Sequence, residues 1–243
     1  MTVKYVYAGN RQISVDVLMF LMNRGVEPSA LIIPENGSHN ILLKRVSKLP
    51  DDLIFTKIDE AGSVLADIQP DYGLYIHYPN IIPEHILNIP KYGSYNLHPA
   101  YLPWNRGWHT PSWAIMDQTP YGATLHQMTG ALDSGDIISQ TRVIVLPGDT
   151  ADSLYKRALA AEYELFVETW PFFEEYKVLE HRKKQGNGTA HKKTDLKRVQ
   201  ELDSIKREFI RTLAACTTND YSEACWFEEN GKRYAVQVRI QEL

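Results

Sequence analysis

The fold is decided by residues 3–25, which read VKYVYAGNRQISVDVLMFLMNRG. Residues 3–8 are mostly apolar and predict a buried strand. Gly9 and Asn10 turn the chain, and Gly25 predicts the end of the helix that follows. The apolar residues of that helix recur at helical spacing, at Val15, Leu18, Met19 and Met22. The stretch therefore predicts a strand, a tight turn and an amphipathic helix.

The same alternation of short strands and helices continues downstream. Apolar runs predict strands at 30–33, 54–55 and 73–78, and helical spacing predicts helices at 41–46 and 60–68. Strands that alternate with helices indicate a mostly parallel sheet. We therefore predict an α/β fold, with a Rossmann-like, mostly parallel sheet flanked by helices. Ligands of such sheets bind at the carboxyl ends of the strands.

A change in composition separates the second half of the chain into two parts. Asp149 and Thr150 can cap a long helix that we predict to run to about residue 178. Residues 181–193 are then rich in Lys, Arg, Gly and Gln, which predicts a linker or mobile loop with a solvated charge run. We predict two domains, a main domain at 1–180 and a small C-terminal extension at 181–243.

The extension carries a helical pattern at 196–215, followed by a hairpin pattern. Its strands are predicted at 224–227 and 234–240, and Asn230-Gly231 between alternating apolar runs is a strong short-range hairpin signal. An isolated hairpin is at best marginally stable in water. We therefore predict a homodimer, with strand 234–240 or the long helix after Asp149 in the interface.

Composition and charge disfavour several classes of function. The net charge of -4 disfavours nucleic acid as the main ligand, although a local basic pocket could still bind a small anion. Cys216 and Cys225 have neither CxxC nor zinc spacing and predict reduced thiols in a cytoplasmic protein. We find no signal-peptide pattern and no apolar run of the roughly 20 residues that a membrane span needs. We therefore expect no membrane partner.

Residues 94–107, SYNLHPAYLPWNRG, contain the first group of residues suited to catalysis. Asn96 and His98 are two apart in a predicted strand, so their side chains lie on one face. Pro99 and Pro103 end that strand. An amide can donate to an oxyanion while an imidazole moves a proton, which suits acyl transfer. Taken alone, an Asn-x-His pair is as often a satisfied structural pair.

The second group surrounds Asp133. It lies in the turn Leu132-Asp133-Ser-Gly-Asp-Ile137, after the run Gly122-Ala-Thr-Leu-His126. A carboxylate in such a turn can reach into a cleft, but Asp-Ser-Gly-Asp is also ordinary turn chemistry. We predict no metal site, because the residues that could hold one fit no common zinc spacing; these are His98, His109, His126 and Asp133.

The turn Gly9-Asn10-Arg11 is a third candidate site. It lies at the carboxyl end of a predicted strand but is not GxGxxG, so the motif does not support a dinucleotide site. It is either an ordinary strand-to-helix turn or a phosphate site at a helix N-terminus, assisted by Arg11.

Together these motifs resemble the N10-formyltetrahydrofolate-dependent formyltransferases. The resemblance is strong over residues 70–145 and looser over the N-terminal strand, turn and helix. The matching residues are Asn96-Leu-His-Pro-Ala-Tyr-Leu-Pro103, Arg106-Gly107, Gly122-Ala-Thr-Leu-His126 and Leu132-Asp133-x-Gly135-Asp136-Ile137. The resemblance implies a formyltransferase catalytic domain at 1–180.

The same resemblance implies roles for individual residues. Asn96 would polarise the formyl oxygen, His98 would assist the oxyanion or relay the amine proton, and Asp133 would orient His98. His126 would be a structural support. The donor would be N10-formyltetrahydrofolate, with Ile86 or Leu87 against its pterin and no metal. Its pocket would be lined by Asn80, Ile81, Ile82, Thr129, Gly130 and Asp133.

The subfamily that this sequence is most similar to formylates amino sugars on a nucleotide carrier. The shared features are Gly9-Asn10-Arg11, residues 103–111, Gly188-x-x-His191-x-x-x-Asp195-Leu196 and FEENGK at 227–232. This implies a dTDP-linked 4-amino (or 3-amino) 4,6-dideoxyhexose as acceptor, for bacterial surface polysaccharides. The pyrophosphate would lie at Gly9, Asn10 and Arg11, and the hexose or base at Trp108 and His109. The alternatives are a methionyl-tRNA or glycinamide ribonucleotide formyltransferase, or a non-catalytic nucleotide- or folate-binding module.

Overall fold

The computed structural model describes residues 3–200, 204–217 and 220–241. Its contacts divide the chain into two units. The first, here the main unit, comprises Met1–Val145 and Ala151–His191. The second, here the C-terminal unit, comprises Leu146–Thr150 and Lys192–Leu243.

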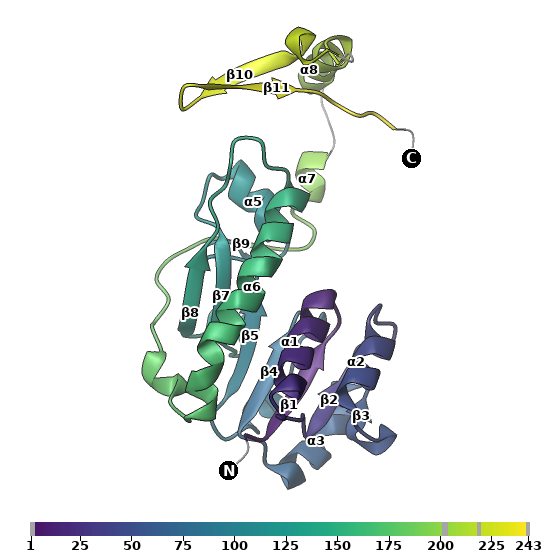
Figure 1. The fold of residues 1–243 in the computed structure, drawn as a ribbon, viewed down its shortest axis with the longest axis vertical. Coiled ribbons are helices and arrows are strands. Elements are labelled where there is room, and N and C mark those ends of the chain that lie inside the picture. Colours follow the sequence, from purple (N-terminus) through teal and green to yellow (C-terminus); the bar gives the residue numbers. More distant parts are fainter. Residues whose placement is uncertain (1–2, 201–203, 218–219, 242–243) are drawn as a thin grey trace. The chain divides into compact units, whose positions relative to one another are not determined.

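A seven-stranded sheet forms the centre of the main unit, in the order β3-β2-β1-β4-β5-β7-β8 (Figure 1). Strands β1 to β5 are parallel, and β7 and β8 are antiparallel to their neighbours. This confirms the predicted mostly parallel α/β fold. The strands are β1 Tyr5–Gly9, β2 Ala30–Ile32, β3 Ile54–Phe55, β4 Tyr72–Ile76, β5 Ser94–His98, β7 Gly122–Gln127 and β8 Ile137–Arg142.

Helices cover both faces of this sheet. One face packs against α1 (Gln12–Asn23), α2 (Asn40–Ser47) and α6 (Ala151–Glu174), and the other packs against α3 (Ile58–Ile68) and α4 (Glu84–Leu87). A shorter helix, α5 (Thr110–Met116), shares a small apolar cluster with α6. The sheet order reverses direction between β1 and β4, so their carboxyl ends form the crevice in which such folds bind ligands.

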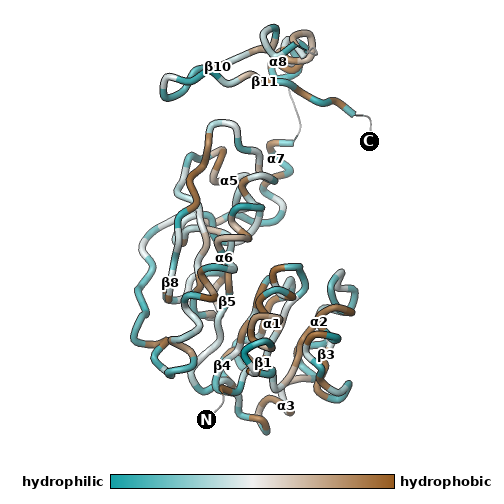
Figure 2. Tube along the Cα trace, viewed as in Figure 1, coloured by the Kyte–Doolittle hydropathy of each residue, from teal (hydrophilic) through white to brown (hydrophobic). Residues whose placement is uncertain are grey.

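The apolar stripe of α1 is rotated slightly from the predicted one. Val15 and Leu18 are buried as predicted, but Met19 is 45% exposed. Val17 and Leu21 are fully buried instead, because α1 packs against both the sheet and α6. Hydrophobic residues accordingly extend over much of α1 (Figure 2).

Two predicted elements end earlier because a residue takes a left-handed backbone conformation. Strand β4 was expected to reach residue 78, but His77 has φ of 51° and ends it at Ile76. Helix α6 was expected to reach residue 178 but ends at Glu174. Tyr176 has φ of 58°, and the N–H of Lys177 donates to Phe172 O at 2.8 Å, which is a Schellman-type helix end.

The C-terminal unit contains the predicted helix and hairpin in modified form. Within the predicted helix 196–215, the described residues form α7 (Lys197–Gln200) and α8 (Ser204–Ala215); residues 201–203 lie outside the described residues. The hairpin pairs β10 (Cys225–Glu229) with β11 (Lys232–Val236) around Asn230 and Gly231. The second strand therefore ends before Val238 and Ile240, which belong to the predicted strand 234–240.

Most of the segment predicted as a linker belongs to the main unit. After the 3₁₀ helix Val178–His181, residues 183–191, here called the strap, pass beside the β5–α5 connection. Strand β9 (Ala190–His191) pairs in parallel with β6 (Arg106–Gly107), and Lys183 forms an antiparallel bridge with Ile137. The linker prediction is wrong for the strap. The strap has no apolar face that a sequence pattern could reveal, and hydrogen bonds of its polar side chains and backbone hold it in place.

No helix in the part of the chain that the structure describes is long and apolar enough to cross a bilayer.

Candidate active site

Asn96 and His98 lie at the carboxyl end of β5, between β4 and β7. Asn96 is opposite Tyr75 of β4 and His126 of β7. Because side chains alternate along a strand, the amide of Asn96 and the imidazole of His98 lie on the same face. His98 is 7% exposed, so its imidazole is nearly removed from water.

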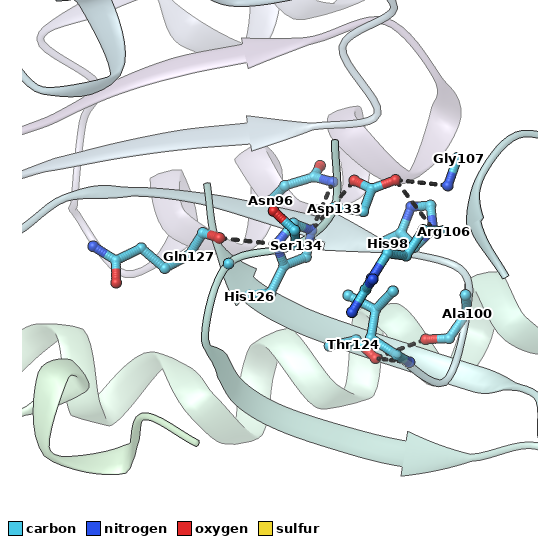
Figure 3. A network of polar contacts seen from close by, with 12 residues as sticks. Asn96, His98, Ala100, Arg106, Gly107, Thr124, His126, Gln127, Asp133 and Ser134 are labelled. Carbon is cyan, nitrogen blue, oxygen red and sulfur yellow. Dashed lines mark hydrogen bonds and ion pairs between the residues drawn. The ribbon is translucent and has the colours of Figure 1, made fainter. Parts of the chain in front are cut away.

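Asp133 brings a carboxylate to these two side chains from the turn between β7 and β8 (Figure 3). Its backbone is left-handed, with φ of 46°. Oδ2 lies 3.6 Å from His98 Nε2, and Oδ1 lies 3.6 Å from His126 Nε2. The N–H of Gly107 donates to Oδ2 at 2.9 Å. The fold therefore assembles Asn96, His98 and Asp133 from two separate segments.

His126 fixes the orientation of the Asn96 amide. His126 Nδ1 lies 3.0 Å from Gln127 O, and a carbonyl oxygen can only accept, so Nδ1 carries the proton of the neutral ring. Nε2 then accepts from Asn96 Nδ2 at 3.2 Å. The second N–H of Asn96 remains available for an acyl oxygen.

The tautomer of His98 follows from the same reasoning. Its Nε2 faces two acceptors, Asp133 Oδ2 at 3.6 Å and Asn105 O at 3.5 Å. The proton of the neutral imidazole therefore lies on Nε2, which leaves the Nδ1 lone pair to accept another. Contacts of this length are common in free enzymes and shorten when the reacting complex forms.

Burial and charge set the ionisation of the pair. Burial lowers the pKa of His98, although the neighbouring Asp133 carboxylate opposes that shift. Burial would raise the pKa of Asp133, but the neighbouring His98 imidazole and the Gly107 N–H hold it well below its usual range. Asp133 is therefore ionised at neutral pH. Both pKa values are lower in the folded than in the unfolded chain, so the free energy of unfolding decreases as the pH is lowered. His98 contributes this loss below about pH 6.5, and Asp133 contributes it below about pH 4.

The two loops predicted to hold the folate lie beside each other. Ile82 follows β4 and packs in one apolar cluster with Met128, which precedes Thr129 and Gly130. A Cβ at Gly130 would lie 3.2 Å from Glu84 Oε2, so the second loop meets the start of α4. The loops differ in exposure: Asn80 is exposed and Ile81 is 89% exposed, whereas Ile82, Ile86 and Leu87 are buried.

The Gly9-Asn10-Arg11 turn lies at the same edge of the sheet. Gly9 is paired with Ile76, which is paired with Leu97 between the two β5 site residues. Two strand spacings therefore separate this turn from β5, roughly 10 Å. The N–H groups of Asn10 and Arg11 donate to Ser14 Oγ at 3.2 and 3.3 Å, so these two amides are already used. An anion would have to be held by the Arg11 side chain and the helix dipole.

Trp108 and His109 follow the backbone that contacts Asp133. Gly107 donates its N–H to that carboxylate, and Trp108 N donates to His191 O at 3.0 Å in the strap. Trp108 is 39% exposed, and His109 has φ of 58° at the start of α5. Both side chains therefore belong to a segment that is tied to the site.

Several residues that support this site were missed at the level of sequence. Gln185 and Thr189 of the strap hydrogen-bond Arg106 and Asn105. No local pattern could have revealed them, because they are isolated polar residues in a Lys- and Gly-rich segment. In the described ranges, 3–200, 204–217 and 220–241, no three His, Cys, Asp or Glu side chains gather as a metal site would require.

The sequence matches a known family over the region that builds the site. Residues 56–170 match the family model described as "Formyl transferase". Over 150 residues, 60% of this chain, the sequence is 28% identical to the "dTDP-4-amino-4,6-dideoxyglucose formyltransferase" of Mycobacterium bovis, of which it spans 64%. The chain spans less than two thirds of the length of the curated relatives compared here.

Solved structures share the fold. A "4-N formyltransferase" from Francisella tularensis has a TM-score of 0.73 at 24% identity, over 99% of both chains. The formyltransferase PseJ from Anoxybacillus kamchatkensis, "in complex with UDP-4,6-dideoxy-4-formamido-L-AltNAc and tetrahydrofolate", has a TM-score of 0.56 at 22% identity. That likeness covers 80% of this chain and 88% of the other.

The ionisation of His98 can be measured directly by NMR titration of the histidine ring signals, with His98→Gln to assign them. We expect a pKa below about 6.5 because the imidazole is buried. In Asp133→Asn the pKa should fall further, because the carboxylate that favours the imidazolium is gone. A pKa above 6.5, or a rise in Asp133→Asn, would contradict this description of the site.

Proposed function

We propose that this chain transfers the formyl group of N10-formyltetrahydrofolate to the amino group of a nucleotide-linked amino sugar, because residues 56–170 match the formyl transferase family model. The acceptor that we infer is a dTDP-4-amino-4,6-dideoxyhexose. The observation that carries the proposal is the convergence of Asn96, His98 and Asp133 at the carboxyl end of β5. The nucleotide sugars named for the similar proteins support this class of acceptor.

The folate supplies the formyl group that the amine receives. Asn96 donates its free amide N–H to the acyl oxygen as negative charge develops there. His98 would accept the amine proton at Nδ1 as the new C–N bond forms, and would pass it to N10 of the folate as the bond between the formyl carbon and N10 breaks. The ionised Asp133 stabilises the imidazolium across Nε2 in between. The nearly dry surroundings of His98 strengthen each of these interactions.

The loops at 80–82 and 129–130 would hold the folate in this proposal. The exposed Ile81 offers an apolar surface in the first loop, and the exposed Asn80 and Thr129 offer polar groups, one in each loop. The buried Ile82, Ile86 and Leu87 form the apolar support beneath. We propose that this pair of loops binds the folate next to Asp133.

Removal of any member of the trio should reduce kcat more than it raises either KM. For Asn96→Ala, His98→Ala and Asp133→Ala we expect losses of about 100-fold or more, because these contacts form mainly in the transition state. Steady-state kinetics with both substrates varied gives the two parameters separately. Asp52→Ala, an exposed acid beside the far edge strand β3, serves as the control and should keep native kcat. Near-native kcat in two folded trio variants would reject the assignment.

The acceptor lies on the other side of the site in this proposal. The turn at Gly9, Asn10 and Arg11 is roughly two strand spacings from β5, a distance that a hexose can span between its amine and the pyrophosphate. Burial raises the pKa of Tyr155, and the charge of Arg11 opposes that rise. Trp108 and His109 would contact the hexose or the base.

Arg11→Ala should raise the KM for the amino sugar and leave kcat and the folate KM nearly unchanged. The pyrophosphate is remote from the reacting amine, so Arg11 binds ground and transition states equally. Initial rates with each substrate varied in turn measure this. Arg45→Ala, at an exposed arginine of α2, is the matched control. An unaltered sugar KM, or an effect on the folate KM alone, would refute the pyrophosphate site.

We also propose that the chain is a homodimer through its C-terminal unit. Among the residues described in that unit, the only buried hydrophobic side chains are Leu213 and Ala224. Ile205, Phe209 and Trp226 are 79%, 63% and 56% exposed. A helix and a hairpin with so little core require a partner surface. We propose that the chain works in the cytoplasm, a reducing compartment in which thiols such as those of Cys216 and Cys225 remain reduced.

Sedimentation velocity tests the homodimer. The native chain should sediment as a dimer, and Phe209→Glu should shift it toward monomer because a charge then enters an apolar interface. Ile41→Glu, at an apolar position of α2 that is also exposed, should remain a dimer. A monomeric native chain over a wide concentration range would remove this proposal.

A further inference from the structure

Gln185 of the strap uses all of its side-chain hydrogen-bonding capacity at the active-site turn. Its Nε2 donates to Asp133 O at 2.9 Å and to Gly135 O at 2.6 Å. Its Oε1 accepts from Arg106 Nε at 3.0 Å and Nη2 at 2.8 Å. One amide therefore joins the turn that carries the Asp133 carboxylate to the β6 strand that follows β5.

Thr189 makes an equivalent connection to the residue that faces His98. Its Oγ1 accepts from Asn105 N at 2.8 Å and lies 3.2 Å from Asn105 Oδ1. Asn105 is fully buried, has φ of 59° and presents its carbonyl 3.5 Å from His98 Nε2. Thr189 therefore fixes the carbonyl that, with Asp133, sets the tautomer of His98.

The backbone of the strap also packs directly against the connection between β5 and α5. Strands β9 and β6 pair in parallel, and the Gly107 of β6 donates to the Asp133 carboxylate. Gly188 passes so near Pro103 O that a Cβ at this position would collide with it. Backbone contacts at Gly188 and in β9 therefore fix the position of the strap next to the site.

The conformation of Asp133 explains why such contacts are needed. A left-handed φ of 46° is uncommon for a residue with a Cβ and persists only where neighbouring contacts hold it. The turn has an apolar neighbour at Leu132, but that side chain is 60% exposed and contributes little packing. The hydrogen bonds of Gln185 to the turn carbonyls therefore supply what apolar packing does not.

We propose that the strap is a positioning element, in which Gln185 aims the Asp133 carboxylate and Thr189 aims the carbonyl of Asn105 at His98. This inference rests on the proposed function, because it assigns the two strap side chains to the same reaction. Neither side chain touches substrate. Each acts through a residue of the site, so its loss should affect the chemical step and not the binding of either substrate.

Gln185→Leu tests this directly. The variant keeps the size of the side chain but loses all four hydrogen bonds, and kcat should fall by about 10- to 100-fold, since a displacement of the order of 1 Å has effects of this size. Both KM values should stay within about threefold of native. The pKa of His98 should also fall, because a displaced Asp133 no longer favours the imidazolium. A variant that changed only general stability would not shift this pKa in the folded protein.

Matched variants separate the contributions. Gln185→Glu retains an acceptor for Arg106 but turns a carboxylate toward two carbonyls, so it should lose at least as much kcat as Gln185→Leu. Thr189→Val should lower kcat, and Thr189→Ser, which restores the hydroxyl, should recover it. Asn187→Ala removes an exposed amide from the same strap and should behave as native. If Gln185→Leu fails to fold, the Thr189 pair decides the outcome.

Native kcat and a native His98 pKa in both Gln185→Leu and Thr189→Val would overturn the proposal while leaving the formyltransferase assignment intact. A rise in KM with native kcat would also overturn it, because the strap would then bind substrate. Failure of the proposed function and failure of the strap proposal can be distinguished. Absence of formyl transfer by the native chain would reject the proposed function. The pKa of His98 in the strap variants would still show whether the strap positions Asp133.

Discussion

The buried carboxylate of Asp133 is the charge around which the site is arranged. Removing an ionised carboxylate from water is costly unless charged or hydrogen-bonding partners compensate it. Here the compensating groups are the Nε2–H of His98, from β5, and the N–H of Gly107, from β6, while the carboxylate itself comes from the turn after β7. These three segments can be correctly placed only when the sheet, the β5–α5 connection and the strap are all in position. The ionisation of one side chain therefore links the local chemistry to the packing of the whole main unit.

The sheet topology offers the two ligands of the proposed reaction separate places around β5. Strand β5 lies in the middle of the ligand-binding edge, with the reversal between β1 and β4 on one side and β7 on the other. The Gly9 turn belongs to the first side, and the loops that contain Asn80 and Gly130 lie next to β5. In the proposed reaction, an anionic acceptor at the Gly9 turn would reach Asn96 from the end of β1, and the formyl donor would lie at the loops after β4 and β7, which flank β5. Asn96, oriented by His126, is placed to meet the acyl oxygen between them.

Local sequence patterns predicted those features that depend on local physics. The two-residue period of a strand placed Asn96 and His98 on one face, and helical spacing located α1, although its buried stripe is rotated so that Met19 is exposed. Features that depend on long-range polar contacts were not predictable. The left-handed residues His77 and Tyr176, which end β4 and α6, carry no composition signal. The strap was misread because its binding to the site uses Gln185, Thr189 and backbone hydrogen bonds, and apolar periodicity detects only hydrophobic burial.

The most direct test of the account is product analysis by mass spectrometry. The full chain would be incubated with N10-formyltetrahydrofolate and a panel of dTDP- and UDP-linked 3-amino and 4-amino dideoxyhexoses. The account predicts that one amino sugar of the panel gains a single N-formyl group, that an equal amount of tetrahydrofolate forms, and that no product forms without the folate. Folded protein that formylates no sugar in the panel would contradict the central claim that Asn96, His98 and Asp133 form an amino-sugar formyltransferase site.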